Sequence, residues 1–109
     1  EYNNVINAPL SAGSGSSEFR TAFNEVIIPG LRKFSPDLLI VSAGFDAHAD
    51  DPLASLNLNK DDFSWVTSEL LSIAEKYSAG RLVSVLEGGY NLEALSSSVS
   101  VHVRELMSV

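Results

Sequence analysis

The sequence predicts an α/β fold with a mainly parallel β-sheet, and three features support this prediction. The run Leu38–Val41 is continuously apolar rather than alternating, which is typical of a strand covered on both faces. A second strand-like run follows at 82–86, and apolar residues at helical spacing lie before, between and after the two runs. The order helix, strand, helix, strand, helix contains one βαβ unit, in which the strands run parallel.

The first helix is expected to begin after the small, glycine-punctuated loop at 11–17, whose last serines offer an N-cap. Apolar residues then recur at helical spacing: Phe19, Ala22, Phe23, Val26 and Ile27. Pro29 and Gly30 are expected to bend or interrupt this helix, because proline lacks the N–H group that a helix interior uses. The turn at 35–37 follows, so the helix is expected to end by Phe34.

Asn59 is the expected N-cap of the second helix, and Asp62 lies where a carboxylate also favours the helix dipole. Gly80 is expected to close this helix in the left-handed conformation. Its apolar stripe consists of Phe63, Val66, Leu70, Ile73 and Tyr77. The third helix begins near Asn91. Its stripe consists of Leu92, Leu95, Val99, Val103 and Leu106, and His102 lies on its polar side, where a surface position is expected.

The composition is that of an ordinary globular domain: 109 residues, 45% hydrophobic and 19% charged. A net charge of −7 without a Lys/Arg cluster argues against binding to nucleic acid or to an anionic membrane, and it suits a cationic substrate, although mild acidity also simply keeps a protein soluble. No run approaches the ~20 apolar residues of a membrane span. We expect a cytoplasmic location, or a nuclear one in a eukaryote. Because cysteine is absent, a metal would be held by His, Asp or Glu.

Two polar side chains, Asp46 and His48, follow the first strand in a loop that runs from Gly44 to Leu58. Loops at the carboxyl ends of parallel strands are where open α/β sheets bind ligands. In an extended segment Asp46 and His48 point to one side, so the pair can supply two metal ligands. Alternatively, Asp46 caps the turn and His48 is a solvated loop residue. Local sequence leaves both interpretations open.

The second strand runs out at Gly88 and Gly89, which allow positive φ or a close approach to a ligand. Tyr90 follows, with a phenol that can donate a hydrogen bond to a developing oxyanion. The alternative is a turn pair followed by a packing tyrosine. The chain has neither the Walker spacing with its lysine nor three spaced glycines for a dinucleotide. It also lacks a cysteine nucleophile and a nucleophile-elbow serine.

In combination, three blocks resemble the carboxyl-terminal part of the zinc-dependent histone deacetylase superfamily. They are Ser42–His48, Asp51–Leu53 and Leu86–Asn91, in this order. The resemblance also includes Asn7–Leu10, covers nearly the whole chain, and is closest to class II and bacterial deacetylases, including acetylpolyamine amidohydrolases. It implies that residues 1–109 are the carboxyl-terminal segment of a single three-layer α/β/α domain of the arginase–deacetylase type.

The resemblance implies a role for each matching residue. Asp46 matches the family's last zinc ligand. Tyr90 matches the tyrosine that hydrogen-bonds the scissile amide's carbonyl oxygen and the oxyanion formed from it. Gly88 and Gly89 match glycines beside the acyl-lysine channel, and Leu53 matches an apolar wall of that channel.

His48 matches no ligand, because the family's Asp-x-His pair belongs to an earlier strand, and we exclude it from the metal. That pair and the family's adjacent His-His pair are absent here, so one of three zinc ligands is present. The resemblance implies part of a zinc-dependent deacetylase that hydrolyses acetyl-lysine or an acetylated polyamine to acetate and a free amine. Iron can occupy the same ligands. Without the remainder of the domain, the segment is expected neither to hold catalytic zinc nor to hydrolyse an amide.

Two other functions compete with this interpretation. An arginase-like binuclear metal hydrolase shares the fold class, but a single Asp followed by Ala-His and the Gly-Gly-Tyr turn fit it poorly. A non-catalytic binding or scaffold module would retain the deacetylase fold without its chemistry. Two central-type strands also leave an open edge and a bare face, so further strands are expected from outside these residues.

Overall fold

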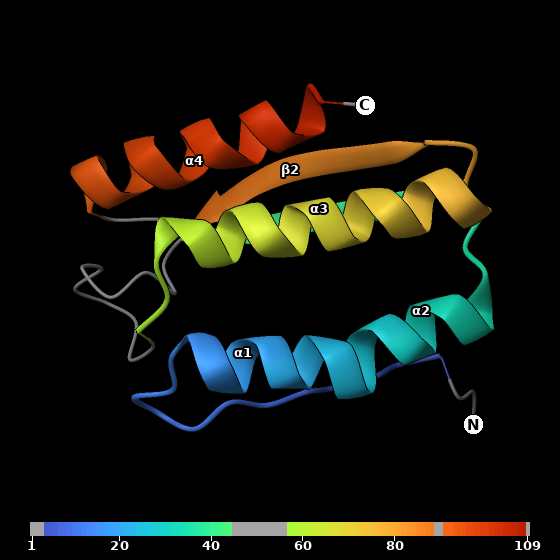
Figure 1. Cartoon of the computed structure of the whole chain (residues 1–109), viewed down its shortest axis with the longest axis horizontal. Helices are drawn as coiled ribbons and strands as arrows, with labels where there is room; N and C mark the ends of the chain where they lie inside the picture. Colours follow the sequence, from blue (N-terminus) through green and yellow to red (C-terminus); the bar gives the residue numbers. More distant parts are fainter. Residues whose placement is uncertain (1–3, 45–56, 89–90, 109) are drawn as a thin grey trace.

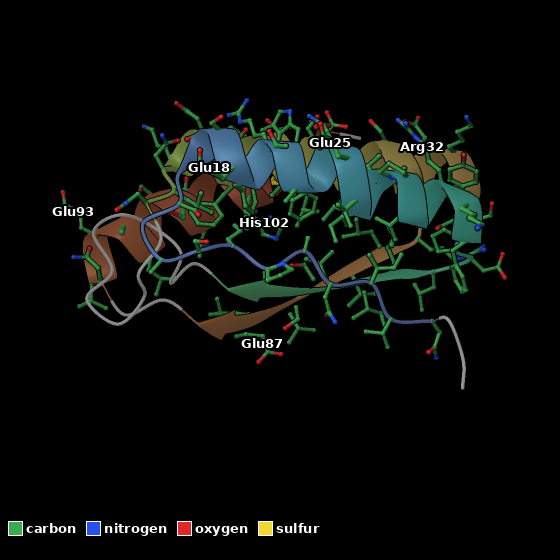
Figure 2. The ribbon with its side chains drawn as sticks, turned by 90° about the horizontal axis from the view of Figure 1, so that it is seen from below. Glu18, Glu25, Arg32, Glu87, Glu93 and His102 are labelled. Carbon is green, nitrogen blue, oxygen red and sulfur yellow. The ribbon has the colours of Figure 1, made fainter. Side chains whose placement is uncertain are left out.

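The computed structural model describes residues 4–44, 57–88 and 91–108. Its elements follow the predicted order of helix, strand, helix, strand and helix (Figure 1). The two strands pair in parallel, and the helices lie on one side of them (Figure 2). The predicted α/β class and parallel pairing are therefore confirmed. None of the described helices is both long and apolar enough to cross a membrane.

The first helical segment runs without a break through α1 (Ser16–Ala22), η1 (Phe23–Ile27) and α2 (Ile28–Phe34). Its middle part is a π-helical turn, in which the N–H of Ile28 donates to the carbonyl of Phe23. Pro29 explains this widened turn, because its ring has no N–H and would crowd the carbonyl four residues earlier in a regular α-helix. The predicted interruption is present, but it lies in the turn before Pro29.

Helix α3 (Lys60–Tyr77) has the predicted ends. The side chain of Asn59 accepts hydrogen bonds from the backbone N–H groups of Asp61 and Asp62, and the carboxylate of Asp62 accepts from the N–H of Asn59 at 3.0 Å. This reciprocal pair satisfies donors that a helix start leaves unpaired. At the other end Gly80 has a φ of 79° and Ala79 a φ of 51°, so two successive left-handed residues close the helix.

Strand β1 (Leu39–Gly44) pairs with β2 (Leu82–Gly88) in an unbroken register from Leu39 opposite Leu82 to Ala43 opposite Leu86. The next partners are Gly44 and Gly88, so Glu87 is an extra residue on β2. Such a bulge increases the local twist and redirects the end of a strand.

Two apolar clusters join the helices to the sheet. The first consists of Ile28, Leu39, Ile73 and Ala74, with Phe23, Leu31, Tyr77 and Leu82 packed against it. The second consists of Ala43, Leu58 and Phe63, with Phe19, Val41, Leu95, Val99 and Val101 packed against it. These clusters lie near opposite ends of β1, so the helical layer is attached along the whole strand.

The sheet face that points away from the helices is uncovered among the described residues. Ile40 is 67% exposed there, and Val83 and Val85 are exposed as well. Glu87 projects to the same side (Figure 2). All described helices lie on one side of the strands, so the cover expected on the second face of the sheet does not come from the described part of this chain. The expected bare face is present.

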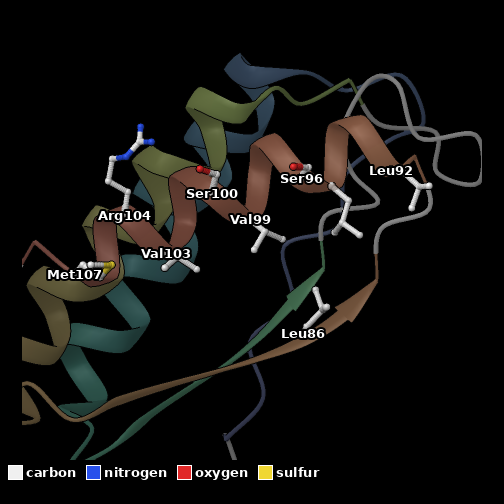
Figure 3. Close-up of a pocket in the computed structure, with 9 residues that line it drawn as sticks. Leu86, Leu92, Ser96, Val99, Ser100, Val103, Arg104 and Met107 are labelled. Atoms are coloured by element: carbon white, nitrogen blue, oxygen red, sulfur yellow. The ribbon is translucent and has the colours of Figure 1, made fainter.

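Helix α4 (Leu92–Leu106) begins as predicted at Asn91, whose side chain accepts from the N–H of Ala94 at 2.8 Å. Its apolar stripe is not the face that it buries. Leu92 is 81% exposed, and with Leu86, Val99 and Val103 it lines an open groove between α4 and β2 (Figure 3). The buried residues of α4 are Ala94, Ser98 and His102.

Candidate functional site

The carboxyl ends of the two strands lie side by side. Gly44 ends β1, Gly88 ends β2, and these glycines are register partners. In the sequence, Asp46 follows Gly44 by two residues and Tyr90 follows Gly88 by two. The parallel pairing therefore brings the two strand ends together as far as Gly44 and Gly88.

Most of the predicted site residues lie outside the described residues, so their roles stay predictions. These are Asp46, His48, Leu53, Gly89 and Tyr90. Gly88 is described and is partly buried. It lies at the end of β2 opposite Gly44, and its place beside the acyl-lysine channel stays a prediction.

The described residues on either side of 45–56 are anchored near the end of β1. Leu58 packs in the same cluster as Ala43. The backbone N–H of Asn57 donates to the carbonyl of Ser14 at 2.8 Å, and its side-chain amide donates to the carbonyl of Gly13 at 3.0 Å. The chain therefore leaves the sheet at Gly44 and returns to the same region at Asn57.

A histidine between the helices and the strands joins three elements (Figure 2). His102 of α4 is only 8% exposed. Its Nδ1 lies 2.7 Å from Oγ1 of Thr67 in α3, and its Nε2 lies 2.8 Å from Oγ of Ser84 in β2. The expected surface position of His102 is wrong, because α4 turns the face with Ala94 and Ser98 inward and carries His102 with it.

The hydroxyl of Thr67 determines the direction of these hydrogen bonds. It donates its single proton to the carbonyl of Phe63 at 2.6 Å, so it accepts from His102, and we assign the ring proton to Nδ1. In the neutral ring Nε2 then accepts from the hydroxyl of Ser84. Burial lowers the pKa of His102 from its usual 6.5, which favours this neutral form.

Two sequence signals point to this network. Ser84 is the polar residue in the otherwise apolar run 82–86. His102 follows Ala94 and Ser98 at intervals of four, which marks a second helix face made of small residues. Hydrophobic periodicity alone does not reveal that face, because the apolar stripe of α4 is the stronger pattern.

The described residues do not by themselves form a metal centre. Within 4–44, 57–88 and 91–108, no three His, Cys, Asp or Glu residues gather as they would around a metal ion. Both ring nitrogens of His102 are directed at hydroxyl groups, which makes it unsuited to be a ligand. A metal site in this chain would therefore need residues outside the described ones, where the predicted ligand Asp46 lies.

Comparison with known proteins identifies the family. Residues 1–106 match the histone deacetylase domain. The chain is 50% identical over 96 residues to "Histone deacetylase 10, chloroplastic" of Oryza sativa subsp. japonica, with 88% of this chain and 22% of the rice protein covered. It is 42% identical over 86 residues to "Histone deacetylase-like amidohydrolase" of Pseudomonas aeruginosa, with 79% of this chain and 23% of the bacterial protein covered.

Among solved structures, the histone deacetylase Clr3 is similar to this chain, with a TM-score of 0.84 and 34% identity over 94% of this chain and 17% of Clr3. The chain thus spans between a sixth and a quarter of the length of these relatives. The similarity in sequence and in backbone agrees with the parallel strands and flanking helices described above. The chain belongs to the histone deacetylase domain family, and its α/β structure is part of an arginase–deacetylase-type fold.

Proposed function

We propose that this chain is the carboxyl-terminal segment of a zinc-dependent deacetylase. In the complete domain it would act on the acetylated side chain of lysine or on an acetylated polyamine and release acetate and a free amine. The observation that carries the proposal is the pairing of Gly44 with Gly88, because it brings together the two strand ends that precede Asp46 and Tyr90. The relatives named as deacetylase and amidohydrolase support the same reaction class.

Asp46 is the residue of this chain that would hold the metal. Zinc, or iron in its place, would need further ligands from outside residues 1–109, since only one family ligand is present in the sequence. When bound, such a metal polarises the amide carbonyl and activates water.

Tyr90 would contribute directly to the reaction. Addition of water to the amide carbonyl turns the carbonyl oxygen into an oxyanion, and the phenol of Tyr90 would donate a hydrogen bond to it. Collapse of this tetrahedral species breaks the C–N bond, and the amine leaves with a proton. A donor that bonds the oxyanion more strongly than the carbonyl lowers the barrier rather than merely tightening binding.

Leu53, Gly88 and Gly89 would line the channel that admits the acylated chain. Glycine at 88 and 89 allows close passage of an extended side chain, and Leu53 supplies an apolar wall for its methylene groups. The net charge of −7 suits substrates that carry further amino groups, such as polyamines or lysine-rich peptides. We propose a cytoplasmic or nuclear location for the complete protein, although the rice relative is named chloroplastic.

Two substitutions in the complete protein test this assignment. Tyr90→Phe removes the oxyanion donor, and we expect kcat for an acetyl-lysine peptide to fall by roughly 10²–10³. Asp46→Asn weakens the metal site, and we expect loss of bound zinc, measured by atomic emission, together with loss of activity.

Matched controls are available in described parts of the chain. Tyr77→Phe changes the same residue type on α3, where the ring packs against the first apolar cluster, and Asp61→Asn changes an exposed carboxylate. Both are expected to retain normal turnover and zinc content. If Asp46→Asn and Tyr90→Phe leave turnover at the level of these controls, the proposed site is wrong.

A further inference from the structure

Two elements lie on either side of residues 89 and 90 in the sequence, and a hydrogen bond joins them. Strand β2 ends at Gly88, and α4 begins after Asn91, which caps the helix through the N–H of Ala94. The hydroxyl of Ser84 in β2 bonds Nε2 of His102 in α4 at 2.8 Å. This bond connects β2 to α4 directly, so it limits how far the two elements can separate.

Apolar contacts hold the carboxyl half of β2 only weakly to the helices. Leu82 packs against the first cluster at the beginning of the strand. Val83 and Val85 face the uncovered side, and Leu86 is 61% exposed. Among the described residues, the hydrogen bond of the Ser84 side chain joins β2 to the helical layer. No described side-chain hydrogen bond to the helices follows it before Gly88.

The other side of the histidine is anchored on α3. Thr67 accepts from Nδ1 of His102 and in turn donates to the carbonyl of Phe63. Ser84 donates to Nε2 of His102, so the donor and the acceptor of each of these three hydrogen bonds are defined. Thr67 is buried, and Phe63 belongs to the second apolar cluster. The ring is therefore held from both sides, by a buried bond to Thr67 and a partly buried bond to Ser84.

We propose that His102 is a positioning residue of the deacetylase, which holds together β2 and α4, the elements that precede and follow Tyr90 in the sequence. The brace consists of Ser84, His102 and Thr67, and it acts through these two elements rather than by contact with substrate. This inference rests on the proposed function, in which Tyr90 donates to the oxyanion. A displaced donor lowers the rate of the chemical step more than it weakens substrate binding.

Four variants of the complete protein separate this role from a merely structural one. Ser84→Ala removes the bond to β2. His102→Asn keeps a donor near the position of Nδ1 and loses the bond to Ser84, whereas His102→Gln keeps an acceptor near the position of Nε2. The matched control is Ser64→Ala, which removes a 2.9 Å hydrogen bond from α3 to Glu105 of α4 without touching β2.

We expect Ser84→Ala and His102→Asn to lower kcat about tenfold, with KM within about twofold of the wild type. His102→Gln should retain most of the wild-type kcat, and Ser64→Ala should retain it fully even where its melting temperature falls as far as that of Ser84→Ala. Hydrogen exchange of residues 82–88, followed by mass spectrometry, should accelerate in Ser84→Ala and His102→Asn but not in Ser64→Ala.

The inference is overturned if kcat of Ser84→Ala stays at the level of Ser64→Ala, or if His102→Gln loses as much kcat as His102→Asn. Tyr90→Phe, measured in parallel, distinguishes this failure from failure of the proposed function. If Tyr90→Phe lowers kcat and Ser84→Ala does not, the positioning role of His102 is wrong but the proposed function stands. An unimpaired Tyr90→Phe, or a wild type without deacetylase activity, contradicts both.

Discussion

Asp62 is a buried carboxylate that holds together the beginnings of two helices. Its Oδ2 accepts from the hydroxyl of Ser16 at 2.6 Å and from the N–H of Asn59 at 3.0 Å. Its Oδ1 accepts from Nε of Arg20 at 3.1 Å, and the guanidinium also lies over the ring of Trp65, 5.0 Å from its centre. The sequence predicts a favourable helix-dipole position for Asp62, but the bonds to α1 arise from packing.

We expect Asp62→Ala to lower the free energy of unfolding of the complete protein by about 2–3 kcal/mol, since it removes a cap and leaves buried donors without an acceptor. Chemical denaturation measures this change. Asp61→Ala is the control, because Asp61 is exposed and in the same helical turn. Its effect should stay below about 1 kcal/mol. Equal losses in the two variants would show that helix-dipole effects, rather than the buried bonds, are responsible.

His102 makes stability depend on pH in a defined direction. Burial lowers the pKa of the folded ring from 6.5, so at intermediate pH the unfolded chain binds the proton more readily. The stability associated with the neutral ring is therefore fully present above the unfolded pKa. It is lost as pH falls from there through the folded pKa.

Comparison of the wild type with His102→Gln tests this dependence, since both share every other titrating group. Between about pH 7.5 and pH 5.5, urea unfolding should show a larger loss of stability for the wild type than for the variant. Parallel losses would mean that His102 does not titrate differently in the two states.

At the scale of elements, α4 shows how packing selects a face that hydrophobicity does not. The helix buries Ala94, Ser98 and His102 and leaves much of its apolar stripe on the open groove. Small residues permit close approach of two helices, and the bonds from His102 to Thr67 and from Ser64 to Glu105 tie this helix to α3. On this face the hydroxyl of Ser98 is fully buried and has no hydrogen-bond partner among the described residues.

We expect Ser98→Ala to stabilise the complete protein by roughly 1 kcal/mol, because it removes an unsatisfied buried hydroxyl and raises helix propensity. Ser97→Ala on the same helix has the same gain in propensity but loses a hydrogen bond to the carbonyl of Ala94 at 3.2 Å. The melting temperature of Ser98→Ala should therefore exceed that of Ser97→Ala. The reverse order would indicate that Ser98 has a partner in the complete protein.

At the scale of the whole molecule, the described residues contain the beginning of a domain core rather than a closed one. One sheet face, the groove along α4 and the outer edges of both strands remain uncovered in the part of the chain that the structure describes. The relatives are several times longer than this chain. The remainder of the deacetylase domain is the partner that we propose for these surfaces.

A direct measurement on the purified 109-residue segment tests this proposal. We expect neither stoichiometric zinc binding in calorimetry nor hydrolysis of an acetyl-lysine peptide, because one carboxylate ligand cannot hold a catalytic zinc ion. The complete protein, assayed in parallel, is the positive control. Tight zinc binding together with deacetylation by the segment would contradict the proposal.

Local sequence was sufficient to place the elements of this protein. The cap at Asn59, the beginning of the third helix near Asn91 and the left-handed Gly80 depend on interactions among residues close in the chain, and each is confirmed. The parallel order of the two strands follows from the predicted βαβ order of elements, and it is also confirmed. The sequence also allowed the family to be predicted, because the motifs that contain Asp46 and Tyr90 directly follow the two strands.

Tertiary packing alone decided which side chains those elements bury. His102 became a buried link rather than a surface residue because α3 and β2 approach α4 on its small-residue face. The π-helical turn moved the expected interruption ahead of Pro29, and the sheet kept one bare face because every described helix lies on the other. Periodicity within one element specifies its possible faces, but the free energy of contact with neighbouring elements selects among them.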